Sequence, residues 1–241
     1  GRASEKVILE KTRSIVEKEV ERSKVFDATL EDSIPQFELN ELSLGRVVGR
    51  GGFCVAREIT SIKLKVEEDV SNRKFGGLSL LRKSSHSMPH SEGESTREYL
   101  ARRLWSKAGK YVIKQVDSEL FYSDRVTFLK GMIDIALETK YLASLDHPHV
   151  LKIRGISRTS PFELGYFVVL DQLQETLGKR LNHWMQRKRA TKGITGALTG
   201  GKGKVNKLFT ERLLAVYDIA EAMDYLHGKR IIYRDLVRID A

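Results

Sequence analysis

The sequence predicts an α+β fold, in which a small antiparallel sheet carrying one long helix is followed by a helical region. Two observations lead to this prediction. Short apolar segments typical of strands lie on both sides of one long amphipathic segment, residues 124–145. The order along the chain is three strands, a helix, two strands and then further helices. This order is typical of a sheet with one packed helix, followed by a helical part.

The composition is that of a globular protein that can bury a core, because 41% of the 241 residues are hydrophobic and 31% are charged. The one cysteine, Cys54, excludes an internal disulfide, and we expect an intracellular protein, cytoplasmic or nuclear. No apolar run approaches the ~18 residues of a membrane span. The chain starts with Gly1 and without a secretory signal, so we expect a processed or incomplete product.

The net charge of +10 is concentrated in two segments. Residues 61–110 hold 11 Lys and Arg against 6 Asp and Glu, and residues 186–207 hold 7 Lys and Arg and no acid. Both segments have the composition of loops. We interpret them as solvated basic insertions or as docking sites for an acidic partner, RNA or anionic lipid. Nucleic acid is not favoured, because a binding face would interleave basic with aromatic residues on ordered elements.

The first 41 residues are expected to form a helical extension and a linker. Charged and apolar residues alternate at near-helical spacing over residues 4–26, which predicts an amphipathic helix. Two short apolar stretches then flank a glycine cluster and predict a β-hairpin over 42–59. Residues 61–110 are expected to form a long loop, disordered in part, with a short helix at 97–107.

A strand at residues 111–116 leads into the long helix at 124–145. Asp124 can cap this helix. His147-Pro148 ends it, because proline disfavours helix at the preceding residue. The apolar stripe predicted for its packed face consists of Val126, Leu129, Ile133, Leu137, Tyr141 and Leu142.

Two strands, residues 150–156 and 166–170, and two helices follow. The first helix is predicted over 176–188 and the second over 210–227, with a basic, glycine-rich stretch between them. Gly228 is a suitable C-terminal stop for the second helix. The apolar stripe of the second helix consists of Leu213, Leu214, Val216, Tyr217, Ile219, Ala220, Met223 and Leu226.

The glycine cluster between the first two strands is the first feature that can carry chemistry. It consists of Gly49-Arg50-Gly51-Gly52-Phe53. Glycine at these positions lets backbone N–H groups approach phosphates closely and permits φ > 0. The alternative is an ordinary glycine-rich hairpin turn.

Three charged residues are further candidates. Lys114 lies inside an apolar strand, and it either faces water at a sheet edge or points into a site. Glu138, in the long helix, is either a solvated glutamate or the partner that holds the Lys114 ammonium against a triphosphate. Asp235 follows Ile231-Ile232 and the pair Tyr-Arg, and it is either a turn aspartate or a base that accepts a hydroxyl proton.

In order and spacing these features resemble the signature set of the protein kinases. The resemblance runs over about residues 42–236, and its most specific part is 224–236, which looks like the end of a kinase helix and the catalytic loop after it. The segment around His147-Pro148 is the second strong match. The resemblance implies a kinase-like N-lobe and a partial helical C-lobe. We expect this partial kinase domain at 42–241, with insertions at about 61–110 and 187–207.

The resemblance implies a role for each matching residue. Asp235 would be the catalytic base, and Lys114 would contact the α- and β-phosphates of ATP and pair with Glu138. Asp240 would be a metal ligand for Mg²⁺, since it offers a hard oxygen. The residues implied in ATP binding belong to the glycine-rich hairpin, the adenine pocket and the hinge: Val48, Gly49, Gly51, Gly52, Phe53, Val112, Lys114, Leu170, Asp171 and Leu173.

Several positions depart from the kinase pattern. Cys54 stands in place of the third glycine, Ala56 in place of a valine, and Tyr233 in place of the histidine of the catalytic loop. Two residues after the catalytic aspartate stands Val237, where a lysine would steady the transferred phosphoryl group. Asp240 stands where the family has asparagine.

The function implied by the resemblance is that of an ATP-dependent protein kinase, expected to act on Ser or Thr of a protein substrate with ATP and Mg²⁺ as cofactors. Because the match breaks after residue 236 and the chain ends at Ala241, we expect an incomplete and inactive fragment. The alternatives are a nucleotide-binding pseudokinase or scaffold, and a binder of nucleic acid or acidic surfaces that acts through the basic insertions.

Overall fold

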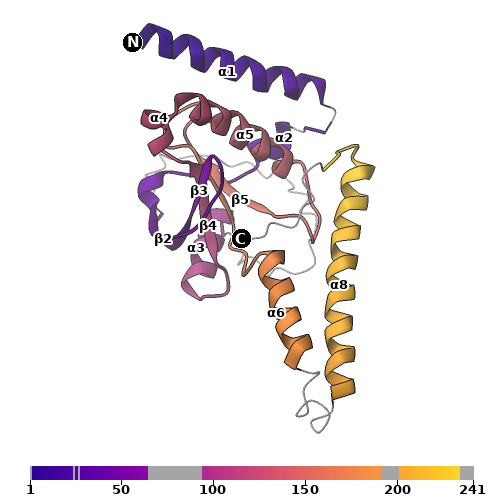
Figure 1. Cartoon of the computed structure of the whole chain (residues 1–241). Coiled ribbons are helices and arrows are strands. Elements are labelled where there is room, and N and C mark those ends of the chain that lie inside the picture. The colour runs from indigo at the N-terminus through magenta and orange to yellow at the C-terminus, as the bar shows by residue number, and fades with distance from the viewer. Residues whose placement is uncertain (1, 24, 27, 65–93, 191–200, 234–241) are drawn as a thin grey trace. The chain divides into compact units, whose positions relative to one another are not determined.

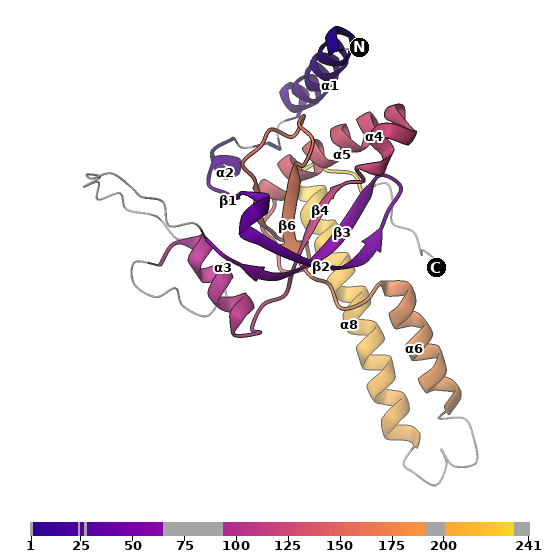
Figure 2. The same ribbon diagram turned by 90° about the vertical axis from the view of Figure 1, so that its left-hand side faces the viewer.

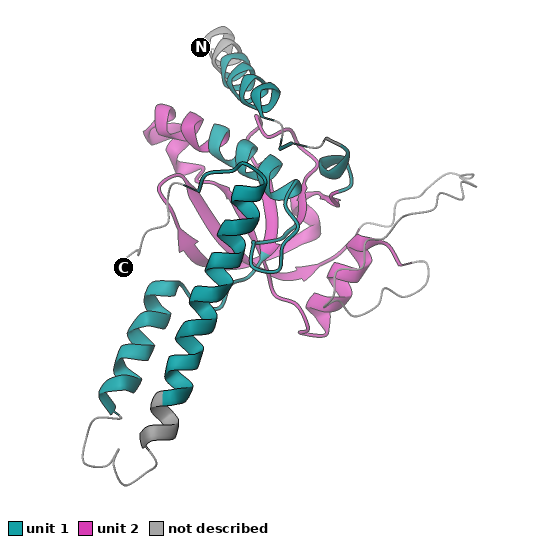
Figure 3. Ribbon diagram, turned by 90° about the vertical axis from the view of Figure 1, so that its right-hand side faces the viewer, with its two compact units in different colours: residues 1–33, 133–153, 171–241 teal, residues 34–132, 154–170 magenta. Residues whose placement is uncertain are grey.

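The computed structural model describes residues 2–23, 25–26, 28–64, 94–190 and 201–233. Figure 1 labels the helices and strands, and Figure 3 colours the two compact units into which the chain divides. Unit 1 comprises residues 1–33, 133–153 and 171–241, and unit 2 comprises residues 34–132 and 154–170. Within the described ranges, no helix has the length and apolar character needed to cross a bilayer.

Unit 2 is built on a six-stranded sheet with the strand order β1-β5-β6-β4-β3-β2. Strands β2, β3 and β4 pair antiparallel, as Figure 2 shows, whereas β1 pairs with β5 in parallel and was not predicted. The α+β fold is thereby confirmed. The strands are β1 (Gln36–Phe37), β2 (Leu42–Arg50), β3 (Cys54–Ile62), β4 (Tyr111–Val116), β5 (Ile153–Ser157) and β6 (Phe167–Asp171).

The hydrophobic core of unit 2 lies on the face of the sheet that Tyr111 and Ile113 share, because alternate residues of a strand point to the same side. Helix α3 (Thr96–Trp105) contributes to this core and confirms the helix predicted inside the first insertion. It begins with a capping box between Ser95 and Glu98. The buried cluster consists of Phe37, Leu42, Ile59, Tyr99, Leu100, Tyr111, Ile113, Phe167 and Val169.

The long helix is α5 (Arg125–Ala143), and a short helix that was not predicted, α4 (Glu119–Ser123), precedes it. The predicted cap at Asp124 is confirmed. The backbone N–H of Thr127 donates to Asp124 Oδ1 at 3.0 Å, and its hydroxyl donates to Oδ2 at 2.6 Å. These bonds satisfy a backbone donor that the first helical turn leaves without a partner.

The apolar stripe predicted for α5 is packed only in part, because Val126 is 63% exposed and the other five residues are half-buried. The fully buried apolar residues of the helix are Phe128, Met132, Ile135 and Ala136. The helix has apolar residues at helical spacing on two neighbouring stripes. The sequence periodicity is compatible with either stripe being buried, and only the position of the neighbouring elements determines which one is.

Besides the C-terminal part of α5, unit 1 contains four described helices, and the periodic segments predicted three of them. Their bounds differ most at the second basic insertion, predicted at 187–207 with loop composition. The structure extends one helix to Ala190 and starts the next at Gly201, so both ends of this insertion are helical, and residues 191–200 lie outside the described part. The helices are α1 (Arg2–Arg22), α2 (Ala28–Asp32), α6 (Leu177–Ala190) and α8 (Gly201–Gly228).

Much of the apolar stripe predicted for α8 is exposed. Leu226 of that stripe is buried, whereas Leu213, Val216 and Tyr217 are each more than half exposed. Helix α6 packs against α8 within unit 1, and one neighbouring helix covers only part of a helix surface. Within the described structure, much of this stripe is therefore left exposed.

Helix α8 ends at Gly228, one residue beyond the predicted bound, and Arg230 rather than the predicted Gly228 reverses the chain. The backbone N–H of Arg230 donates to His227 O at 2.8 Å, and that of Ile231 donates to Leu226 O at 2.9 Å. This is the pair of bonds of a Schellman motif. Arg230 has the left-handed conformation that the motif requires, with φ of 62°. Glycine is the usual residue there.

Candidate functional site

The glycine-rich hairpin of unit 2 connects β2 to β3. The backbone N–H of Gly51 donates to the carbonyl of Cys54 at 2.8 Å and closes the turn. A Cβ atom built on Gly49 or Gly52 would meet nothing within 4 Å, so the space beside these residues is open. These glycines do not use the positive φ values that glycine permits, since Gly165 is the one described glycine with such a value. Their absent side chains leave room for a ligand beside the backbone.

The tip of this hairpin is held by the residues that follow β4. The backbone N–H of Asp117 donates to the carbonyl of Phe53 at 2.9 Å, and Asp117 Oδ2 lies 2.7 Å from Arg50 Nη1. Gly131 of α5 lies beneath the tip, because a Cβ there would come within 2.9 Å of Phe53 Cβ. The turn is thus held by the contacts of Asp117 with Arg50 and Phe53 and by the close packing of Gly131 against Phe53.

Lys114 lies on an interior strand, since β4 runs between β6 and β3. The edge position considered for this lysine is therefore excluded. Lys114 pairs with Ala56 of β3, and Ala56 pairs with Gly49 of β2. A single row across three strands thus joins Lys114 to the glycine-rich hairpin. Lys114 is half-buried and lies on the face opposite Ile113.

Two further candidate residues share this face of the sheet by strand alternation. Val112 lies two residues before Lys114 on β4 and is buried, and Leu170 is buried on the neighbouring strand β6. Val48 lies at an irregularity of the β2–β3 register, between the paired residues Val47 and Gly49, and is 39% exposed. Unit 2 therefore holds all the candidate ATP-binding residues that precede the hinge.

The other candidate residues lie outside unit 2. Glu138 is half-buried in the unit 1 part of α5, and the hinge residues Asp171 and Leu173 also belong to unit 1. Asp235 and Asp240 lie outside the described residues. The pairing of Lys114 with Glu138 and the roles of the two aspartates stay predictions.

In unit 1 the segment around His147-Pro148 contacts the end of α8, and these are the two segments with the strongest resemblance to the protein kinases. The backbone N–H of Asp146 donates to the hydroxyl of Tyr225 at 2.9 Å. The ring of His147 stacks on that of Tyr225, with centroids 4.9 Å apart and planes at 21°. The His-Pro turn after α5 is thereby fixed against the end of α8, which leads into the segment of Asp235.

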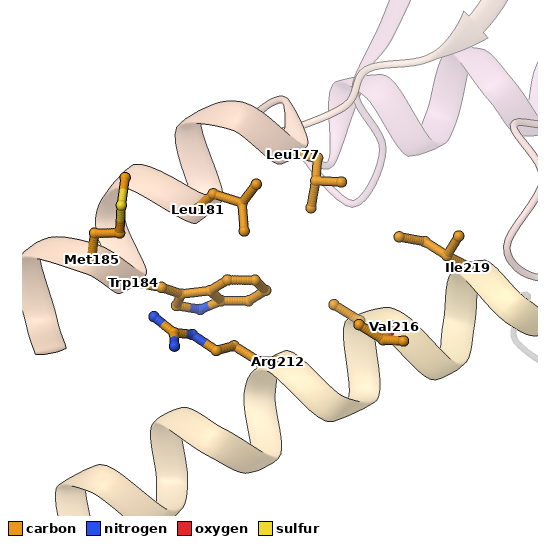
Figure 4. A pocket seen from close by; sticks show the side chains of 8 residues that line it. Leu177, Leu181, Trp184, Met185, Arg212, Val216 and Ile219 are labelled. Atoms are coloured by element: carbon orange, nitrogen blue, oxygen red, sulfur yellow. The ribbon is translucent and has the colours of Figure 1, made fainter. Parts of the chain in front are cut away.

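A pocket between α6 and α8 was not predicted. Its volume is about 390 Å³, and Figure 4 shows side chains from both helices facing it. Trp184 of α6 is buried, its indole N–H donates to Glu211 Oε2 at 3.2 Å, and the guanidinium of Arg212 lies over its ring. The lining residues are Leu177, Leu181, Trp184, Met185, Arg212, Ala215, Val216 and Ile219.

Sequence reasoning also missed Asp117 and Gly131, the residues that support the hairpin tip. Gly131 had a signal, because a glycine inside a helical pattern indicates close packing when it is not at a helix end. Asp117 had none, since its contacts with Arg50 and Phe53 join residues more than sixty positions apart.

The family of the chain follows from a comparison with protein-family models. The model described as protein tyrosine and serine/threonine kinase matches residues 110–238, from the strand of Lys114 to the segment of Asp235. A comparison with curated protein sequences found no match. The matched region covers more than half of the chain, and it includes the strand of Lys114 and the His-Pro turn that packs against the end of α8. The chain belongs to the protein tyrosine and serine/threonine kinase family.

Proposed function

We propose that the protein binds ATP with Mg²⁺ and serves as a protein kinase for Ser or Thr hydroxyl groups. The observation that carries the proposal is the row Gly49–Ala56–Lys114 across three paired strands. It puts a half-buried lysine in the same row as an open, glycine-lined hairpin. Phosphoryl transfer depends on this kind of positioning and charge neutralisation.

In this proposal the hairpin, Lys114 and the two aspartates have separate roles. Backbone N–H groups of the hairpin at Gly51 and Gly52 approach the phosphates, and the Lys114 ammonium binds them as a point charge. Asp235 accepts the proton of the substrate hydroxyl as the γ-phosphoryl group moves from ATP to that oxygen and ADP leaves. Mg²⁺, when bound, supplies neutralisation of phosphate charge, and Asp240 is the proposed ligand.

The adenine base is proposed to bind between apolar side chains. Val48 and Val112 enclose the ring, and Leu170 closes the back of its pocket. The backbone of Asp171 and Leu173 forms the hinge and exchanges hydrogen bonds with the adenine edge. What supports this part is the burial of Val112 and Leu170 on the face of the sheet that carries Lys114.

ATP binding tests the proposal. In the wild-type chain, titration with ATP and Mg²⁺ is expected to raise the melting temperature and to saturate. Lys114→Met removes a charged hydrogen-bond donor and should weaken binding about 10- to 100-fold. Lys110→Met changes an exposed lysine just before the same strand and should leave the affinity unchanged. Equal affinities of the two variants would refute the proposed site.

Turnover is measured separately on serine/threonine and tyrosine peptide libraries. Turnover would contradict the expectation of an inactive fragment, and Asp235→Asn should then lower the rate by roughly 10²- to 10⁴-fold while ATP affinity stays unchanged. Phosphorylation of the tyrosine library alone would contradict the proposed specificity.

A second candidate function is that of a nucleotide-binding pseudokinase. Val237 favours it, because this position lacks the lysine that steadies the transferred phosphoryl group. This function predicts ATP binding that depends on Lys114, without turnover in the wild-type chain. Turnover that appears in Val237→Lys would identify that position as the cause.

A further inference from the structure

Three side chains of metal-ligating type meet on unit 1, and none of them is among the proposed catalytic or ATP-binding residues. His149 Nε2 lies 3.3 Å from Glu221 Oε2 and 3.5 Å from Asp218 Oδ1. One ligand atom from each residue lies within 4.8 Å of the other two. Tetrahedral coordination with bonds of about 2.0–2.1 Å separates neighbouring ligand atoms by roughly 3.4 Å. The two distances from His149 match that separation.

The cluster is supported by the elements that carry it. Asp218 and Glu221 are three residues apart on α8, so they lie on one face of the helix. His149 belongs to the turn after α5, where its backbone N–H donates to His147 Nδ1 at 3.2 Å. His147 in turn stacks on Tyr225, which is one helical turn beyond Glu221. The imidazole of His149 is thus held beside both carboxylates before any ion binds.

Charge favours a divalent cation at this position. The two carboxylates bring a charge of −2 into a space less than 4.8 Å across. A divalent ion together with neutral His149 brings the total to zero, without a proton on the imidazole.

The donor set selects among divalent ions. One imidazole nitrogen with two carboxylate oxygens is a ligand combination that suits Zn²⁺, whereas Mg²⁺ and Ca²⁺ prefer sites built of oxygen alone. Three protein ligands leave a fourth tetrahedral position for water or for an exogenous group. Tyr217 supplies an outer contact, since its hydroxyl hydrogen-bonds to Glu221.

We propose that His149, Asp218 and Glu221 form a Zn²⁺ site between the His-Pro turn and α8. The site is independent of the proposed nucleotide binding and of phosphoryl transfer. Bound Zn²⁺ joins the turn after α5 to the C-terminal half of α8, so it also stabilises the fold of unit 1.

The test is Zn²⁺ binding to the full chain, measured by competition with a chromogenic chelator. Cys54→Ser is made in every protein to remove the thiol as a competing ligand. His149→Asn is expected to weaken Zn²⁺ binding at least about tenfold, and so is Glu221→Gln. His183→Asn is the matched control, because His183 faces a single carboxylate, Glu175, at 3.0 Å and should not affect the affinity.

Co²⁺ gives the second readout, since a tetrahedral site produces intense visible absorption and an octahedral one does not. The wild-type chain should show this absorption, and His149→Asn should lose it while circular dichroism stays unchanged. If His149→Asn fails to fold, Glu221→Gln with Asp224→Asn as control decides the question. The proposal is overturned if Zn²⁺ does not bind, if Mg²⁺ displaces it at equal concentration, or if the cluster variants bind Zn²⁺ as tightly as their controls.

Discussion

The guanidinium group of Arg50, at the end of β2, lies 2.7 Å from the carboxylate of Asp117, which follows β4. Asp117 thereby contacts the hairpin at two points, because its backbone N–H also donates to the carbonyl of Phe53. The pair holds the glycine-rich turn in one position relative to the strand of Lys114. A ligand that binds the turn therefore meets backbone groups that are already ordered.

The first prediction concerns this ion pair. Arg50→Gln removes the pair but keeps the contacts of Asp117 with Phe53. We expect a loss of stability below about 1 kcal/mol, since the Arg50 side chain is 57% exposed and solvent screens the pair. ATP affinity should fall several-fold more than in Arg46→Gln, the control, whose partner Glu58 lies farther away at 3.8 Å. Equal ATP affinities would show that the pair does not order the turn.

The second prediction concerns Gly131. An alanine there would bring Cβ within 2.9 Å of Phe53 and 3.0 Å of Val116. Overpacking costs about 1–3 kcal/mol, and the gain in helix propensity of about 1 kcal/mol offsets only part of it. Chemical denaturation should therefore show Gly131→Ala to be destabilised. In Gly228→Ala the new Cβ meets nothing within 4 Å, so this control should be neutral or stabilised.

The third prediction concerns the end of α8. Arg230 has a left-handed backbone conformation, which costs a residue with a side chain about 1 kcal/mol relative to glycine. Arg230→Gly should raise the free energy of unfolding by about that amount. Arg230→Ala removes the charge and keeps the strain, so it should show no gain. A gain in Arg230→Ala as large as in Arg230→Gly would assign the effect to charge.

The fourth prediction is a pH dependence at the start of α5. Hydrogen bonds from the hydroxyl and the backbone N–H of Thr127 lower the pKa of Asp124 below its ordinary value of 3.8. A lowered pKa in the folded state means that the stabilisation is complete above the ordinary value and is lost as the pH falls through the folded one. Asp124→Ala should lower the melting temperature by about 2–4 °C at neutral pH.

This difference should shrink below pH 3.8, where the wild-type carboxylate takes up its proton. Asp134→Ala, an exposed position later in the same helix, is the control and should change little at any pH. A difference between Asp124→Ala and wild type that persists unchanged in acid would exclude the carboxylate as its source.

The fifth prediction compares the two tryptophans. Trp184 is 5% exposed between α6 and α8, whereas Trp105 is 88% exposed. Trp184→Ala should destabilise the protein by about 3 kcal/mol or more, and Trp105→Ala should change stability by no more than about 0.5 kcal/mol. Denaturation followed by circular dichroism measures both. Similar losses in the two variants would contradict the packing of α6 on α8.

Local structure could be predicted from the sequence where a short pattern of residues favours a single kind of element. An apolar run with a lysine inside it predicted β4 at its observed bounds, and a glycine cluster between apolar stretches predicted the β2–β3 hairpin. The cap at Asp124 followed from its side chain alone. These features depend on neighbours within a few residues of each other.

Long-range packing was the part that sequence reasoning could not predict. The choice of Phe128 over Val126 as the packed residue of α5 depends on where the sheet lies. The pocket at Trp184 depends on the approach of two helices separated by a segment without periodicity. The early start of α8 was hidden by its glycines and lysines, whose propensities gave no helical signal.

Helix α3 sits within the first insertion, yet Tyr99 and Leu100 belong to the core that Tyr111 and Ile113 form on the far side of the Lys114 strand. A segment placed in this way is not a removable appendage. Shortening the insertion through α3 would uncover an apolar sheet face and leave the buried carboxylate of Glu41 without its partner Arg97. Length variation in related chains should therefore spare α3 and accumulate on either side of it.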